Sequence, residues 1–450
     1  MGRNRSSCCI AVLSPVLLAL VGCMSTHSAR EDEDRIKSAV SERVGVARPV
    51  DGVTVPGTVD LGNGLSETEA VQLALCNNAA FQELLVDLGL AHSDLIQAGL
   101  LPNPEFVYIF GTDAKPFKYL VEFPVDSLVL RPVRKRAAEA DVERTRERLI
   151  QAGLDLVRDA RLAYADWVFA RDRVQVAEEN RQLRARITNL TEVRLKAGDA
   201  TPLESSTAKI DTLRAKQEAT RARNDLPVFE ERLRNVIGLG LFRPDLAPER
   251  AETLPPTATN VEALTSEAIA SRPDVRSAER AIEAADARIR LSKLGWLRIL
   301  GIGDATSGQS GNNFSPGFRV GIPIFNWNQG AIARAQAERE KAVRQLQTFR
   351  ERVALEVRQA YALHTQAAVD YRQWTNEIRP EVEQAVRRAD NTYKEGGTSL
   401  LLVLETSRQM IDTRSREAQL RADMFRTWAE LERSVGRKLT AKEGAFAVER

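Results

Sequence analysis

The sequence predicts a mainly α-helical protein with a small β part, built from a duplicated unit of helix, β-hairpin, very long helix and helix. Three observations lead to this prediction. A run of about 70 residues, from Asp126 to Ala197, keeps a helical pattern without a stop. Two shorter regions alternate apolar and polar side chains, as β-hairpins do. The whole pattern then repeats some 198 residues further along the chain.

The composition fits long helices and excludes several other classes of protein. The 450 residues include 64 Lys and Arg and 62 Asp and Glu, so the charges nearly cancel. Without a basic excess, the chain is not expected to bind nucleic acid. Alanine, leucine, arginine and glutamate dominate from about residue 127 onward, which is typical of long helices that pack along one stripe. Such helices suit either the wall of a water-filled tube or a solvent-exposed coiled coil.

The N-terminus has the pattern of a targeting segment. Arg3 and Arg5 precede an apolar stretch of 13 residues, from Cys9 to Val21, which is too short to span a bilayer as a helix. The stretch ends in Leu20-Val21-Gly22-Cys23, which resembles the bacterial lipobox and predicts cleavage before Cys23 and acylation of its thiol. Because Met24 follows and not aspartate, the resemblance implies the outer membrane. The alternative is an ordinary secretory signal with an incidental cysteine.

The duplication is marked by pairs of short motifs. Lys196-Ala197-Gly198 corresponds to Lys394-Glu395-Gly396, and Val236-Ile237-Gly238 corresponds to Ser434-Val435-Gly436, both at an offset of 198 residues. Before the hairpins, Asn78-Ala79-Ala80-Phe81 aligns with Arg272-Pro273-Asp274-Val275 at an offset of 194. The predicted organisation is a lipoprotein signal peptide (1–22), a lipid-anchored N-terminal linker (23–64), a first repeat (65–240), a linker (241–260), a second repeat (261–438) and a C-terminal tail (439–450).

The helices of the first copy have recognisable ends. Ser66 and Glu69 predict a capping box, and the helix that it opens is expected to continue to Leu101, before Pro102-Asn103-Pro104. The long helix from Asp126 to Ala197 would measure about 105 Å, too long for a globular core.

Gly198 suits the left-handed position after a helix, and Thr201-Pro202-Leu203-Glu204 predicts an immediate restart. We therefore expect a tight reversal at one end of a long antiparallel pair. In the second copy, Gly396-Gly397-Thr398-Ser399 predicts the same reversal.

Four strands are predicted from period-two alternation. In the first copy Phe106, Tyr108 and Phe110 alternate with Val107 and Ile109, and Tyr119, Val121 and Phe123 alternate with Lys118, Leu120 and Glu122. In the second copy the expected strands are Trp296 to Ile302 and Phe318 to Ile324, around a polar loop from Asp304 to Pro316. Strands of six to nine residues are short for crossing a membrane. Two hairpins cannot close a barrel, but three chains would supply twelve strands.

The order of these features resembles the TolC family of outer-membrane efflux proteins over residues 65 to 438. The motifs that carry the resemblance are Tyr393 to Glu405, with the sequence YKEGGTSLLLVLE, Ala98 to Pro104, Gly321 to Asn326, and Arg272-Pro273-Asp274. The resemblance implies a homotrimer whose twelve helices form an α-barrel tunnel in the periplasm, below a 12-stranded β-barrel.

The resemblance also implies roles for particular residues. The residues at the two reversals would dock a periplasmic adaptor protein: Lys196, Gly198, Asp199, Thr201, Lys394, Gly396, Gly397 and Thr398. Leu401, Leu402 and Glu405 would form the channel gate, although Leu402 occupies the place of an aspartate found in some members. Three glutamates around a three-fold axis would attract cations, whereas three leucines would exclude water. Ordinary packing between helices is the alternative for each position.

The implied function is the outer-membrane channel component of a tripartite efflux system. It would be a passive export duct for small molecules or metal ions, working with an inner-membrane pump, a periplasmic adaptor and outer-membrane lipid. The alternative is a lipid-anchored periplasmic coiled-coil scaffold without a pore. An enzyme is not expected, because His27, His92 and His364 lie far apart and no metal or nucleophile motif accompanies them. No cofactor and no metal site are predicted.

Overall fold

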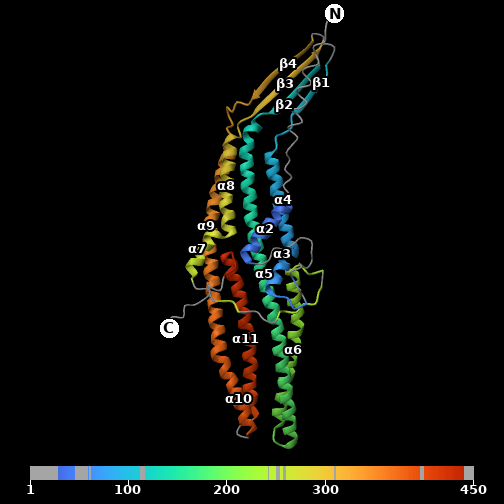
Figure 1. Cartoon of the computed structure of the whole chain (residues 1–450), viewed down its shortest axis with the longest axis vertical. Coiled ribbons are helices and arrows are strands. Elements are labelled where there is room, and N and C mark those ends of the chain that lie inside the picture. The colour runs from blue at the N-terminus through green and yellow to red at the C-terminus, as the bar shows by residue number, and fades with distance from the viewer. Residues whose placement is uncertain are drawn as a thin grey trace.

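The chain forms an extended rod that is mostly helical. The computed structural model describes residues 29–45, 59, 62–111, 117–241, 243–249, 254–256, 260–308, 311–395 and 400–439. Figure 1 shows the strands at one end of the rod and the helix reversals at the other. The predicted fold class, mainly α with a small β part, is confirmed.

Both copies contain the same series of elements. The first copy consists of α3 (Glu67–Asn77), α4 (Ala79–Gly99), β1 (Glu105–Ile109), β2 (Phe117–Pro124), α5 (Asp126–Ala197) and α6 (Pro202–Val236). The second consists of α7 (Val261–Ser271), α8 (Pro273–Leu294), β3 (Ile299–Gly308), β4 (Gly311–Val320), α9 (Gln329–Gln373), a π-helical turn (Trp374–Ile378), α10 (Arg379–Lys394) and α11 (Leu400–Val435).

The helix that was expected to run from Ser66 to Leu101 is two helices, so that prediction was wrong in this respect. Asn78 has an extended backbone, with φ −64° and ψ 113°, and its side chain accepts a hydrogen bond from the Phe81 N–H, so it caps α4. In the second copy Arg272 occupies the same position before Pro273, which disfavours helical geometry in the preceding residue. The predicted correspondence of Asn78 and Arg272 therefore marks a helix break in both copies.

The long helix is confirmed at its predicted bounds. α5 has 72 residues, or about 108 Å at 1.5 Å per residue. Its counterpart is interrupted by the π-helical turn, where the Trp374 indole N–H donates to the carbonyl of Thr413 at 3.1 Å. Pro380 follows this turn and has no N–H to give to the carbonyl one turn earlier, which explains why regular α-helical bonding is lost there.

The four strands form one antiparallel sheet in the order β1-β2-β3-β4. The expected polar loop from Asp304 to Pro316 is wrong, because most of it belongs to β3 and β4, which have ten residues each. β3 pairs with β2 through its backbone as far as Ser307, and this pairing does not depend on apolar side chains. β4 ends at Val320 and not at Ile324, since Pro323 cannot donate to a ladder.

The largest apolar core lies at the middle of the rod, where α3, α4, α5 and the end of α6 meet. Helix α2 (Ala29–Val44) also packs there through buried Ile36, Val40 and Val44. A Cβ at Gly153 of α5 would collide with the side chain of Val40, so the two helices approach closely. Helix α2 was not predicted from the sequence, because its three large apolar residues are spaced among many charges.

The segment between the copies is fixed to both of them. Leu65 and the chain at Ala247 to Glu249 exchange backbone hydrogen bonds of 2.6 and 3.0 Å. His364 of α9 is fully buried and contacts the Pro256 carbonyl at 2.9 Å and the Thr427 hydroxyl at 3.1 Å. None of the described helices is both long and apolar enough to cross a membrane.

Candidate functional site

The sheet has one apolar face, which carries all its aromatic residues, and an opposite face on which charged and aliphatic residues are mixed. Its register places Tyr108 opposite Tyr119, Tyr119 opposite Ala305, and Ala305 opposite Phe314. The apolar face is formed by Phe106, Tyr108, Phe117, Tyr119, Val121, Phe123, Gly301, Gly303, Ala305, Phe314, Pro316, Phe318 and Val320. Glycine and alanine on β3 leave room for rings from β2 and β4. The alternation that the sequence predicted for the first hairpin is therefore present.

The opposite face of the sheet carries paired charges. Lys118 of β2 lies 2.7 Å from Asp304 of β3, and Arg319 of β4 lies 3.6 Å from Glu122 of β2. These pairs were not predicted from the sequence, because Asp304 was expected in a loop. Lys118, Glu122 and Arg319 each directly neighbour an aromatic residue in the sequence, which was an available signal for the face they share. Asp304 had no such signal, because β3 contains no aromatic residue.

The sheet is open at both edges. β1 pairs only with β2, and β4 pairs only with β3, in the part of the chain that the structure describes. An exposed strand edge presents unpaired N–H and C=O groups, which another chain can satisfy. The sheet is thus a segment that a second copy can extend on either side.

The first reversal is built as its residues predict. Gly198 has φ 85° after the last turn of α5, and the Asp199 N–H bonds to the carbonyl of Arg194 at 2.8 Å. Thr201 and Glu204 form a reciprocal capping box at the start of α6. Lys196, Gly198, Asp199 and Thr201 are all exposed, so they form one accessible surface at the end of the rod.

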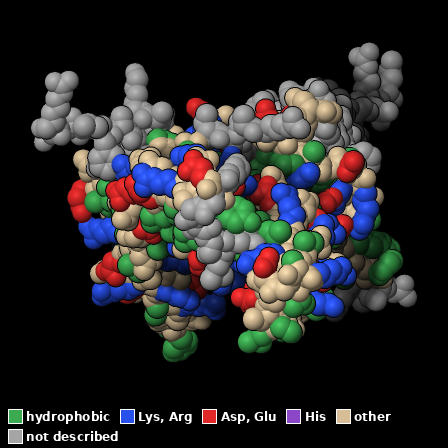
Figure 2. All heavy atoms as spheres, turned by 90° about the horizontal axis from the view of Figure 1, so that it is seen from below, with side chains coloured by type: hydrophobic (Ala, Val, Ile, Leu, Met, Phe, Trp, Pro, Cys, Tyr) green, Lys and Arg blue, Asp and Glu red, His purple; other side chains and the backbone are tan. Residues whose placement is uncertain are grey.

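The second reversal lies at the same end of the rod (Figure 1). Gly396, Gly397 and Thr398 lie outside the described residues, as does Cys23, and Lys394 is the last residue of α10. Leu401 is in the first turn of α11. Leu402 and Glu405, three residues apart on α11, are both exposed, so they share a face that this chain leaves uncovered. Figure 2, seen from this end, shows acidic and basic side chains intermixed with hydrophobic ones.

A ladder of ion pairs joins the two copies along α5 and α11. Its rungs connect Asp155 to Arg433 at 2.8 Å, Asp166 to Arg426 at 2.6 Å and Glu179 to Arg414 at 2.6 Å. None of these pairs was predicted from the sequence. They hold two helices from different copies in a fixed antiparallel register.

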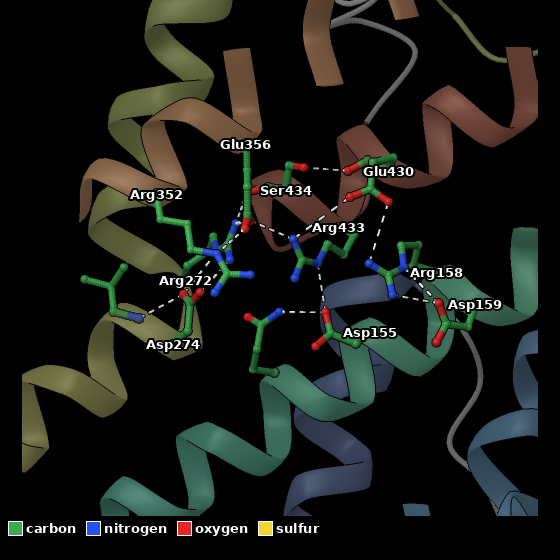
Figure 3. Close-up of polar contacts among 12 residues, drawn as sticks. Asp155, Arg158, Asp159, Arg272, Asp274, Arg352, Glu356, Glu430, Arg433 and Ser434 are labelled. Carbon is green, nitrogen blue, oxygen red and sulfur yellow. Dashed lines mark hydrogen bonds and ion pairs between the residues drawn. The ribbon is translucent and has the colours of Figure 1, made fainter. Parts of the chain in front are cut away.

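The Asp155–Arg433 pair is continuous with a buried network around Arg272 (Figure 3). The Arg272 guanidinium is 1% exposed and donates to Asp274 at 3.0 Å, to Glu356 at 2.8 Å and to the carbonyl of Ser434 at 3.1 Å. Arg433 joins the same Glu356 carboxylate at 2.6 Å. Burial alone would raise the pKa of Glu356, but the hydrogen bond from Arg272 and the two arginine charges outweigh burial and lower that pKa below its ordinary value of 4.5.

Neither the ladder nor the network has the features of a catalytic or metal centre. Each carboxylate in them is paired with at least one arginine side chain. Within the described ranges, no group of three or more His, Cys, Asp or Glu side chains is placed to hold a metal ion. The ion pairs and the Arg272 network connect α5, α8, α9 and α11 to one another.

Comparison with known proteins gives consistent matches. A model of the family described as outer membrane efflux protein matches residues 127–239 and 264–437. The pyoverdine export outer membrane protein OpmQ of Pseudomonas putida is 26% identical over 296 residues, which are 61% of this chain and 60% of that protein. The cobalt-zinc-cadmium resistance protein CzcC of Cupriavidus metallidurans is 24% identical over 390 residues, which are 82% of this chain and 89% of CzcC.

Structural comparison gives the same fold. The crystal structure of CusC superposes with a TM-score of 0.68 at 17% identity, over 84% of this chain and 94% of that one. The chain spans about 60% of the length of the OpmQ relatives that it matches.

Proposed function

Because this chain belongs to the outer membrane efflux protein family, we propose that it is the outer-membrane channel of a tripartite efflux system. In this proposal three copies assemble, their sheets close a 12-stranded β-barrel, and their helices form a tunnel that extends into the periplasm. The channel is a passive duct. An inner-membrane pump supplies the energy, and a periplasmic adaptor connects the pump to the helix reversals.

The two-faced sheet is the observation that carries the proposal. A barrel that crosses a membrane alternates apolar residues toward lipid with polar residues toward its lumen. All the aromatic residues of the four strands lie on one face, as the lipid side of such a barrel requires, and the four paired charges of β2, β3 and β4 lie on the other face, among apolar residues such as Val107 and Ile302. A coiled-coil scaffold, the alternative, gains nothing from exposing this many aromatic side chains to water.

Two arginine substitutions on β4 test the pore. We expect Phe314→Arg to prevent assembly of a membrane-inserted trimer, because Phe314 lies on the apolar face in the middle of β4, and an arginine facing lipid near the bilayer centre costs about 2–4 kcal/mol in each subunit. Ser315→Arg, on the opposite face, is the matched control and should still give a heat-modifiable trimer with altered conductance in planar bilayers. Equal tolerance of both substitutions, without conductance, would favour the scaffold.

The gate is proposed at the start of α11. Leu401, Leu402 and Glu405 would approach the three-fold axis, since Leu402 and Glu405 lie on the uncovered face of this helix. Glu405→Ala should reduce the block of single-channel current by divalent cations, because three converging carboxylates concentrate cations. Asp199→Ala, which removes an exposed carboxylate at the other reversal, should leave the block unchanged. Undiminished block in Glu405→Ala would remove this residue from the gate.

The adaptor is proposed to dock on both reversals. Lys196, Gly198, Asp199 and Thr201 form one of the two sites, and Lys394, Gly396, Gly397 and Thr398 form the other. The capping box of α6 supports this assignment, because it gives the first reversal a fixed shape for a partner to recognise.

The lipid anchor is proposed at Cys23. The expected result for Cys23→Ala is loss of metabolic labelling by a fatty acid, since no other thiol follows a lipobox in this sequence. Cys76→Ser is the control and should keep the label. Persistent labelling of Cys23→Ala would disprove acylation at this residue.

The cargo is proposed as small molecules or metal ions. The names of two relatives support this range, since one refers to pyoverdine export and the other to cobalt, zinc and cadmium resistance. In a passive duct, the partner pump selects the cargo.

A further inference from the structure

An apolar segment lies uncovered between β4 and α9. We call residues 321–328 the junction segment. Four of its side chains expose a large fraction of their surface: Ile322 79%, Ile324 70%, Phe325 92% and Trp327 50%. Large apolar side chains that cluster in one exposed segment indicate a binding surface more often than an ordinary loop.

The junction segment is held in one shape by its asparagines. Asn328 has a left-handed φ of 67°, which a non-glycine residue adopts at a cost in free energy. Its side chain donates to the Ser292 carbonyl at the end of α8 at 2.7 Å, and its N–H donates to Asn326 Oδ1 at 2.8 Å. A Cβ at Gly295 would collide with the Asn328 amide, so the close approach requires glycine there. These contacts fix the backbone at the end of the segment, from Asn326 to Asn328, against the end of α8.

The junction segment continues the apolar face of the sheet. Phe314, Phe318 and Val320 occupy alternate positions on that face of β4. The Gly321 N–H extends the ladder by one hydrogen bond to the Arg298 carbonyl, at 3.1 Å, so Ile322 keeps the same alternation. The Ile324 N–H then bonds to the Ile322 carbonyl at 3.0 Å, so a tight turn at Pro323 follows, with Ile324 and Phe325 exposed beyond it. The apolar surface therefore extends beyond the end of the strand, toward the helices.

This extension is specific to the second copy. In the first copy only Val125 separates β2 from α5, whereas residues 321–328 separate β4 from α9. The first copy therefore shows that a hairpin can be followed almost directly by its long helix, and that the fold does not require a long connection at this point. The length of the junction segment is thus not explained by chain connection, which suggests a separate role for its exposed apolar residues.

We propose that the junction segment lies in the headgroup region of the periplasmic leaflet of the outer membrane and acts as a membrane contact independent of the acyl chain. This rests on the proposed function, because a sheet that crosses the bilayer sets the level of the segment. Phospholipid is the partner that fits. The segment continues the lipid-facing side of the sheet, and Trp327, whose ring centroid is 5.7 Å from that of Trp296, belongs to the residue type enriched at membrane interfaces.

Spin labels on the full-length trimer, reconstituted in phosphatidylethanolamine and phosphatidylglycerol vesicles, test the proposal. In a Cys76→Ser background, one nitroxide is attached at a time after Phe325→Cys, Ile322→Cys, Phe318→Cys or Leu203→Cys. Leu203 is the matched control, because it is 76% exposed and lies beside the reversal at the other end of the rod. Electron paramagnetic resonance then gives the ratio of collisions with oxygen, which dissolves in lipid, to collisions with a nickel chelate, which stays in water.

We expect this ratio to fall in the order Phe318, Ile322, Phe325, Leu203, with Phe325 clearly above Leu203. A high ratio at Phe318 with values at Ile322 and Phe325 equal to that of Leu203 would overturn the inference and leave the pore intact. Protection of Phe325 and Ile322 from both reagents would also overturn it, since a second copy of the chain would then cover the segment. A value at Phe318 as low as that of Leu203 would refute the proposed pore, and the membrane contact with it.

Discussion

Replacing Arg272 with alanine should lower the free energy of unfolding by about 3–5 kcal/mol, the cost of breaking a buried ion pair from one side. Arg272 is almost fully buried and joins the start of α8 to Glu356 of α9 and to the last turn of α11. Its removal takes the guanidinium donor from the Ser434 carbonyl and the arginine partner from the Asp274 carboxylate, which keeps only the Val275 N–H at 2.9 Å among the hydrogen bonds of the described residues. The midpoint of guanidinium unfolding, followed by helical circular dichroism in mild detergent, measures the change.

The matched control for Arg272→Ala is Arg352→Ala. Arg352 donates to the other oxygen of the same Glu356 carboxylate at 2.8 Å, but its side chain is 64% exposed. Its loss should therefore cost less than about 1 kcal/mol. Arg272→Lys should lie between the two, because it keeps the charge but loses the planar fork that reaches several acceptors. Equal effects of Arg272→Ala and Arg352→Ala would show that the buried network adds little stability.

The same network gives the protein a pH dependence. Because the pKa of Glu356 is lower in the folded protein than in the unfolded chain, its contribution to stability is present above about pH 4.5 and is lost as the pH falls through the lowered value. We expect the unfolding midpoint of the wild type to decrease over this acidic range.

The sequence predicted features that depend on neighbours in the chain. The ends of α5 and α6 were predicted correctly because Gly198, Thr201 and Glu204 act within one helical turn. The alignment of the two copies also predicted residues that make equivalent hydrogen bonds. Asn78 donates to the carbonyl of Val236, and its counterpart Arg272 donates to the carbonyl of Ser434, so the aligned residues make the same bond in both copies.

Features that depend on distant residues were not predicted. Asp155 and Arg433 are separated by most of the chain, and 64 basic and 62 acidic side chains offer far too many combinations to select this pair. The strand at Asp304 was missed for a related reason, since its pairing with β2 determines the strand and its own side chains do not. The gate residues came from the family resemblance alone, because their chemistry arises only where several chains meet.

Gly238→Ala should be the most damaging glycine substitution in the described part of the chain. Gly238 follows α6 with φ 74° and completes a Schellman motif in which the Leu239 N–H bonds to the carbonyl of Arg234 at 2.8 Å. An alanine there would lower the free energy of unfolding by about 1–2 kcal/mol, because its Cβ disfavours left-handed backbone geometry. Its Cβ would also overlap the backbone carbonyl of Asn77, and overpacking of this kind typically adds about 1–3 kcal/mol.

Two other glycines separate these costs by experiment. Gly198 has φ 85° and open space around it, so Gly198→Ala should show only the backbone cost. Gly436 has φ 87°, and a Cβ there would lie 3.0 Å from Cγ of the Arg272 side chain, which can shift where the backbone of Asn77 cannot. Guanidinium midpoints should therefore decrease in the order Gly198→Ala, Gly436→Ala, Gly238→Ala. If all three fell equally, backbone strain alone would be responsible, and the close packing of α6 against the break between α3 and α4 would not contribute.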